Sequence, residues 1–205
     1  MSPSASTRTA PASRPWVPVA DVRYYMACLD LRGRRCLVVG GGSVAVEKVH
    51  GLLDCEAHVA VFAPHVDDEL RRLPVRIERR AFRDDDLDGN LLVVAATDDR
   101  AVNAQVSRAA AERSLLCNVA DDPELCSFIL PALVRRDPIV VGVSTGGASP
   151  ALAQRIRADI AELVGPEHAA LARRLAALRP WAKRTLPTYE ARRDYFQQVV
   201  AEELR

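Results

Sequence analysis

Short apolar runs alternate with segments of helical periodicity through residues 21–122. Several of the apolar runs have no polar face, which is typical of strands in a parallel sheet that is covered by helices on both sides. We expect strands within residues 34–39, 58–64, 76–82, 91–96 and 115–119, and helices within residues 43–57 and 100–114. This pattern predicts a Rossmann-like α/β domain over residues 21–122.

The pattern changes after Pro123. Residues 127–147 read as two strands joined by the turn RRDP, which predicts an antiparallel hairpin instead of another strand–helix unit. Ser149 is suited to cap the helix that follows, and Pro150 to be its first residue. We therefore expect a hairpin element over residues 123–150.

The last part of the chain, residues 151–205, has a helical composition. The first helix is expected to stop at Gly165, and the remainder to be broken at Pro180 and Pro187, because proline cannot donate a backbone hydrogen bond. We expect a helical C-terminal domain over this range.

The N-terminal residues 1–20 are rich in proline, serine and threonine and carry no acidic residue. They contain no apolar run of the kind found in secretory signals, so we expect a disordered tail. In the whole chain, 28 basic residues balance 27 acidic ones. A net charge of +1 argues against nucleic acid or an anionic membrane as a partner.

Cysteine and histidine are too scattered to predict a metal site. The five cysteines are an odd number without a CxxC pair, and the four histidines form no HxxxH pair. We expect no protein metal centre, and free thiols in a reducing compartment, which suggests the cytoplasm.

The strongest local motif is GGGSVA at residues 40–45, which follows a strand and begins a helix. Gly40 is expected to make the sharp turn, and Gly42 to leave room for a pyrophosphate at the helix N-terminus. The motif predicts a dinucleotide site. The next strand ends in Ala63, Pro64 and His65 instead of an acidic ribose anchor, so these residues leave the choice between NAD and NADP open.

Polar residues also follow the next two parallel strands, where α/β sheets bind ligands. Thr97 and Asp98 end one strand, and Asn118 and Asp121 lie at the end of the other. A carboxylate beside a nicotinamide can act as a general base. The alternative for Asp121 is a structural cap on the turn before Pro123.

The segment STGGASP before the last strand-to-helix junction is polar and rich in glycine. Ser144 and Thr145 in it form either an anion site at a helix start or an ordinary capped turn. Arg135 and Arg136, on the hairpin turn, are suited to an anionic substrate or are simply solvated.

These motifs together resemble the precorrin-2 dehydrogenase family, which includes the dehydrogenase/ferrochelatase region of siroheme synthases. The resemblance runs from about Tyr25 to the end of the chain. It is carried by GGGSVAVEKV, VFAP, LLVVAATDD, CNVADDPELCSFILPALV and VGVSTGGASPALAQRIR, in the order and spacing of the family.

The resemblance implies a homodimer whose hairpin and helical tail exchange contacts, and NAD⁺-dependent oxidation of precorrin-2 to sirohydrochlorin. Some members also insert Fe²⁺, and Co²⁺ is a further possible metal substrate. Asp121 matches the catalytic aspartate of the family. The NAD contacts of the family fall on Ser43, Val44, Pro64 and His65, with Ala63 and Thr97 beside them. The carboxylates of the tetrapyrrole would bind Asn118, Arg135, Arg136, Ser144 and Thr145.

Two positions depart from the family pattern. Thr145 stands where one branch carries a regulatory phosphoserine. Glu56 stands where glycine usually ends the first helix, and a left-handed glutamate costs about 1 kcal/mol, so we expect this helix to end differently. Two alternative functions are a homologue that only chelates metal and an NAD-sensing regulatory module. The intact glycine motif disfavours the first, and the missing acidic ribose anchor disfavours the second.

Overall fold

The computed structural model describes residues 23–204, and they form two compact units divided between Leu130 and Pro131. The tail expected over residues 1–20 lies outside the described residues. The hairpin element was expected to begin at residue 123, whereas residues 123–130 belong with the first unit. Each unit is described by itself.

The first unit contains a five-stranded parallel sheet in the order β3-β2-β1-β4-β5. Its strands are β1 (Arg35–Val39), β2 (His58–Phe62), β3 (Arg76–Glu78), β4 (Leu92–Ala95) and β5 (Leu116–Val119). The apolar runs without a polar face form the central strands of the sheet. β1 and β4 are buried along almost their whole length, which only apolar side chains on both faces allow. The Rossmann-like prediction is confirmed.

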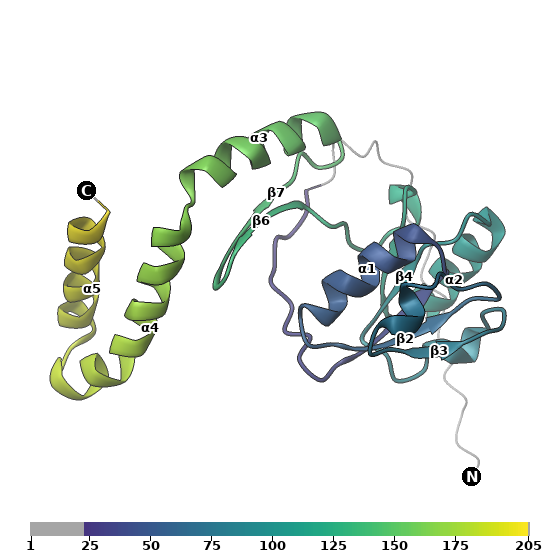
Figure 1. Ribbon diagram of the computed structural model, residues 1–205, viewed down its shortest axis with the longest axis horizontal. Coiled ribbons are helices and arrows are strands. Elements are labelled where there is room, and N and C mark those ends of the chain that lie inside the picture. The colour runs from purple at the N-terminus through teal and green to yellow at the C-terminus, as the bar shows by residue number, and fades with distance from the viewer. Residues whose placement is uncertain (1–22, 205) are drawn as a thin grey trace, which may run out of the picture. The chain divides into compact units, whose positions relative to one another are not determined.

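Helices α1 (Ser43–Leu53) and α2 (Arg100–Glu112) cover opposite faces of this sheet (Figure 1). Val46 and Val49 of α1 pack in one apolar cluster, and Val106 of α2 packs in the other. The part of this unit from residue 23 on also contains three short 3₁₀ segments: η2 (Leu70–Arg72), η3 (Asp84–Leu87) and η4 (Pro123–Leu125).

Glu56 adopts the left-handed conformation that was expected to be avoided. Its φ is 58°, and its N–H donates to the carbonyl oxygen of Leu53 at 2.8 Å. Its own carbonyl oxygen accepts a hydrogen bond from Gly33 N–H at 2.9 Å. The prediction that α1 ends differently is therefore wrong, because these backbone contacts hold the chain in the turn that glycine would otherwise favour.

The second unit begins with the antiparallel hairpin of β6 (Ala132–Arg136) and β7 (Ile139–Val143), as predicted. Three helices follow it: α3 (Pro150–Leu163), α4 (Pro166–Thr185) and α5 (Tyr189–Glu203). Helix α3 packs on the hairpin face that carries the buried residues Val134 and Val143. Ser149 caps α3 by accepting a hydrogen bond from Leu152 N–H at 3.2 Å, as expected.

Pro180 does not break the helical tail, contrary to the prediction. Helix α4 continues through Pro180 to Thr185, whereas Pro187 does lie in the break before α5. A proline inside a helix leaves a carbonyl one turn earlier without its donor, and an exposed carbonyl can bond water instead. Within residues 23–204, no helix is long and apolar enough to cross a membrane.

Candidate cofactor and catalytic site

The glycine turn between β1 and α1 is packed so closely that two of its glycines have no room for a side chain. Gly40 has a φ of 129°, and a Cβ there would overlap the carbonyl oxygen of Ala96 after β4. A Cβ on Gly41 would overlap the carbonyl oxygen of His65 and lie 2.9 Å from the Cβ of Ala63. The turn therefore fixes the ends of β1, β2 and β4 against one another.

Gly42 has a different role, because a Cβ on it would meet no protein atom within 4 Å. Gly42 is the N-cap of α1, and no side chain caps this helix. The first backbone N–H groups of α1, including those of Ser43 and Val44, are thus left for a ligand or water. With no acidic residue in the first turn, the open space at Gly42 fits the phosphates of a dinucleotide.

The end of β2 lies directly against this turn. Gly40 N–H donates to the carbonyl oxygen of Phe62 at 3.0 Å, and Asp67 N–H donates to the carbonyl oxygen of Gly41 at 2.8 Å. Ala63 is buried between these contacts, while Pro64 and His65 are exposed. The structure thus brings together the cofactor residues that the sequence predicted at the ends of β1 and β2.

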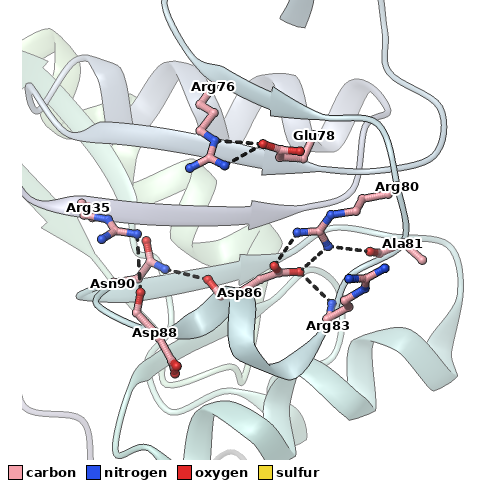
Figure 2. A network of polar contacts seen from close by, with 9 residues as sticks. All are labelled: Arg35, Arg76, Glu78, Arg80, Ala81, Arg83, Asp86, Asp88 and Asn90. Carbon is pink, nitrogen blue, oxygen red and sulfur yellow. Dashed lines mark hydrogen bonds and ion pairs between the residues drawn. The ribbon is translucent and has the colours of Figure 1, made fainter.

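Beside them, Arg80 and Asp86 form a salt bridge that the sequence reasoning did not find (Figure 2). The two Nη atoms of Arg80 donate to the two carboxylate oxygens of Asp86 at 2.8 and 2.6 Å. The guanidinium carbon of Arg80 also lies 4.6 Å from the centre of the Phe62 ring. Hydrogen bonding to Arg80 lowers the pKa of Asp86 below its usual value. The only sequence signal was a run of charges after a short strand.

Thr97 follows β4 at the predicted edge, but its side chain is engaged inside its own loop. Its hydroxyl lies 2.8 Å from Asn103 Oδ1 and 3.0 Å from the carbonyl oxygen of Asp99, and it accepts a hydrogen bond from Asp99 N–H. Asp99 in turn caps α2 through Ala101 N–H at 2.8 Å. The cofactor contact of Thr97 therefore stays a prediction, with its hydroxyl already satisfied by the loop.

Asp121 projects from a strained turn at the end of β5. Its φ is 59°, its side chain is exposed, and it makes no hydrogen bond or ion pair with any residue between 23 and 204. The alternative role as a cap gains no support, since η4 has Asp122 as its N-cap and no side-chain cap bond. Ala120 N–H donates to the carbonyl oxygen of Ala95 at 2.9 Å, which ties the turn to β4. Glu56 and Ser114 share this left-handed conformation, which aspartate adopts more readily than most residues, so the conformation directs the side chain but does not by itself mark a functional site.

A shallow hollow of about 550 Å³ lies beside this turn. Asp121 and Asp122 line it from β5, and Asp98 and Arg100 line it from the loop and helix that follow β4. Arg100 is 85% exposed, and its Nε lies 3.6 Å from a carboxylate oxygen of Asp122. The sequence reasoning missed Arg100, because a lone arginine in the first turn of a helix has no distinguishing signal.

Asn118 is buried under the same turn, and its expected contact with substrate stays a prediction. Only 7% of it is exposed, and its Nδ2 donates to the carbonyl oxygen of Phe128 at 3.1 Å. Two of the five cysteines, Cys36 and Cys117, are buried thiols, whereas Cys28 is exposed and the other two are partly buried. Burial raises the pKa of Cys117 to about 12 and that of Cys36 to about 11. Cys28, Cys36, Cys55, Cys117 and Cys126 are all free.

The remaining predicted residues lie in the second unit. Arg135 and Arg136 are exposed at the end of β6. Thr145 Oγ1 accepts a hydrogen bond from Ser149 N–H at 3.1 Å and lies 3.1 Å from the carbonyl oxygen of the same residue. Ser144 Oγ accepts a hydrogen bond from Gly146 N–H at 3.2 Å. The loop therefore forms the capped turn, which was one of the two structures that the sequence allowed. Binding of substrate by Ser144 and Thr145 stays a prediction.

Comparison with known families gives two adjoining matches. Residues 27–132 match a family described as "Putative NAD(P)-binding", which is half of the chain. Residues 136–163 match the family described as sirohaem biosynthesis protein central.

Relatives of known name agree with these families. The siroheme synthase of Methylococcus capsulatus is 41% identical over 181 residues, which are 86% of this chain and 38% of that protein. The siroheme synthase of Pseudomonas fluorescens is 42% identical over 174 residues, 83% of this chain and 38% of that protein. The chain thus spans less than two fifths of these relatives.

A solved structure named SirC, precorrin-2 dehydrogenase, matches with a TM-score of 0.74 and 28% identity. The match covers 86% of this chain and 89% of that chain. The likeness to precorrin-2 dehydrogenases and siroheme synthases that the motifs indicated is confirmed, and the chain belongs to the NAD(P)-binding family that its residues 27–132 match.

Proposed function

We propose that this chain binds NAD⁺ and oxidises precorrin-2 to sirohydrochlorin. The observation that carries the proposal is the position of the unpaired Asp121 carboxylate. It lies at the carboxyl ends of the sheet strands, where the open space at Gly42 also lies. Only β4 separates the strands that end in these two features. Two strand spacings put the ends of β1 and β5 about 10 Å apart, a separation that a dinucleotide bound at the glycine turn can bridge with its nicotinamide end.

The described residues fit a dinucleotide. The amide groups of Ser43 and Val44 would hold the pyrophosphate over Gly42, and Ala63, Pro64 and His65 would lie along the adenosine ribose. When bound, the oxidised nicotinamide supplies the acceptor for the hydride that leaves the substrate.

Asp121 would take the proton that leaves the substrate in the same oxidation. Removal of one hydride and one proton from precorrin-2 gives sirohydrochlorin, NADH and a proton, so the step needs a base but no further oxidant. An exposed carboxylate without a basic partner is free to accept this proton and release it to water. The same carboxylate is suited to take pyrrole N–H protons if Fe²⁺ or Co²⁺ is inserted afterwards.

NAD⁺ is the proposed form of the cofactor. A 2′-phosphate on the ribose would need a free arginine near the end of β2, and residues 63–65 provide none. The nearby Arg80 is already bound to Asp86 and stacked on Phe62. An NADP⁺ phosphate would have to displace one of these contacts or bind the exposed Arg79, which follows Glu78 beside Ala63.

The substrate carries eight carboxylates, so basic side chains are the expected anchors. We propose that Arg100 binds one of them beside Asp121, because it is 85% exposed and is the one basic side chain among residues 23–204 that lines the hollow. The other charged residues of the lining are Asp98, Asp121, Asp122 and Glu124, which would repel further carboxylates. Arg135, Arg136, Ser144 and Thr145 are proposed to bind others from the second unit.

We also propose a homodimer, and the cytoplasm as its location. The hairpin face opposite α3 carries Leu133, 39% exposed, and Val140, 43% exposed, on neighbouring strands. Exposed apolar side chains of this kind, with Arg135 opposite Val140 on the same face, are suited to contact a second copy of the chain. The free thiols agree with a reducing compartment.

The proposed function is tested by supplying enzymatically prepared precorrin-2 with NAD⁺ or NADP⁺ and following NADH or NADPH formation. We expect turnover with NAD⁺ and a much higher KM for NADP⁺. Adding Fe²⁺ or Co²⁺ to the product, against the spontaneous rate, tests metal insertion. A chain that binds NAD⁺ but never reduces it in the presence of precorrin-2 would contradict the proposal and favour the regulatory-module alternative.

A further inference from the structure

The outer edge of β5 is closed by side chains instead of by another strand. β5 is the last strand of its sheet, so the N–H groups that point away from β4 need other partners. Cys117 N–H donates to Ser127 Oγ at 2.7 Å, and Val119 N–H donates to Cys126 Sγ at 3.1 Å. Two consecutive residues after η4 therefore satisfy alternate backbone positions of this strand.

Asn118 strengthens the same contact from the strand. Its buried side chain donates to the carbonyl oxygen of Phe128 at 3.1 Å and reaches Cys126 Sγ at 3.6 Å. Ser127 N–H also donates to the carbonyl oxygen of Cys117 at 2.8 Å. Asn118, Cys126 and Ser127 thus form one polar group, the edge clasp, which holds the segment after η4 against β5.

The edge clasp encloses the turn that carries Asp121. The single thiol proton of Cys126 reaches the carbonyl oxygen of Val119 at 3.3 Å or that of Asp122 at 3.4 Å, one on each side of Asp121. Burial raises the pKa of this thiol, so it stays protonated and able to donate. A left-handed aspartate persists only where the surrounding contacts fix it.

We propose that Asn118 and Cys126 are positioning residues that fix the left-handed turn from which the Asp121 carboxylate projects for proton transfer. The inference rests on the proposed function, and it gives Asn118 a role behind the catalytic turn instead of a contact with substrate. Neither side chain needs to touch substrate or cofactor, because both act through the backbone on either side of Asp121.

The test replaces Cys126 with alanine and with serine in the full-length chain. Cys126→Ala removes the acceptor of Val119 N–H and the donor to the carbonyl oxygens. Cys126→Ser keeps both functions on a shorter bond. Cys55→Ala is the matched control, since this half-buried free thiol lies between α1 and the start of β2, away from β5 and its turn. Asn118→Asp, which removes the donor to Phe128 at nearly constant volume, tests the second member.

We expect Cys126→Ala and Asn118→Asp to lower kcat for precorrin-2 oxidation about 10-fold, since sub-ångström displacement of a catalytic group already slows proton transfer. The KM for NAD⁺ and its calorimetric Kd should stay within about 2-fold of the parent values, because the glycine turn after β1 lies two strands away from the edge clasp on β5. Cys126→Ser should recover kcat to within about 3-fold of the parent, a rescue that depends on hydrogen bonding.

The inference is overturned if Cys126→Ala keeps the parent kcat, or if it weakens NAD⁺ binding as much as it lowers kcat, which would indicate a general loss of folding. Serine performing no better than alanine would also overturn it. These outcomes differ from failure of the proposed function, in which the parent chain itself would not oxidise precorrin-2.

Discussion

Replacement of Gly42 by alanine separates cofactor binding from folding. A methyl group at this position meets no protein atom within 4 Å, and the backbone, at φ −90° and ψ −170°, is open to any residue. The folded state should lose only about 0.5–1 kcal/mol, because alanine is a poorer N-cap than glycine. In the complex, the same methyl occupies the space of the pyrophosphate. Loss of one charge-assisted amide–phosphate hydrogen bond costs about 2 kcal/mol, or about 30-fold in Kd.

Isothermal titration calorimetry with NAD⁺ and urea denaturation measure the two effects separately. Gly51→Ala is the matched control in the same helix, where a Cβ also meets open space. It should raise stability by about 0.5–1 kcal/mol and leave Kd unchanged. Gly41→Ala should instead destabilise the fold by at least about 2 kcal/mol, since its Cβ overlaps the backbone of His65. Parent-like affinity in Gly42→Ala would refute the phosphate site, and parent-like stability in Gly41→Ala would refute the packing argument.

Three further predictions concern stability and assembly. Glu56→Gly should raise the free energy of unfolding by about 0.5–1 kcal/mol, since it relieves a left-handed glutamate; an unchanged denaturation midpoint would contradict this. Asp86→Asn should lower stability at neutral pH by about 1–3 kcal/mol. The pKa of Asp86 is lowered in the folded chain, so its contribution is present above the unfolded pKa of about 4 and is lost as the pH falls through the folded value. Urea titrations of parent and variant should therefore converge in acid, and a constant difference would exclude this ion pair as the cause. Leu133→Asp should convert the proposed dimer to monomer in light scattering, and a variant that keeps the mass of a dimeric parent would contradict this interface.

Periodicity was enough to predict the sheet domain, and glycine placement was enough to predict the sharp turn after β1. Apolar runs without a polar face are typical of strands in the middle of a covered sheet. The motif at residues 40–45, placed between a strand and a helix, is typical of a dinucleotide-binding turn. The sequence could not show which glycine is packed and which is open. That distinction depends on Ala96 and His65, which come from the ends of other strands.

The misses have the same physical origin. Pro180 was expected to break a helix because local propensity counts the missing donor, whereas the solvent around an exposed helix can replace it. Glu56 was expected to avoid a conformation that backbone contacts with Leu53 and Gly33 impose. The edge clasp was invisible, because nothing in the spacing of Asn118 and Cys126 reveals that β5 is an edge strand.

The central claim is that Asp121 accepts a proton while NAD⁺ is bound at the glycine turn of the same sheet edge. The most direct measurement compares NADH formation from precorrin-2 by the parent chain and by Asp121→Asn, with the NAD⁺ affinity of both determined by calorimetry. The account predicts that the variant binds NAD⁺ within about 2-fold of the parent and loses at least about 100-fold in kcat. A variant that oxidises precorrin-2 at the parent rate would contradict it.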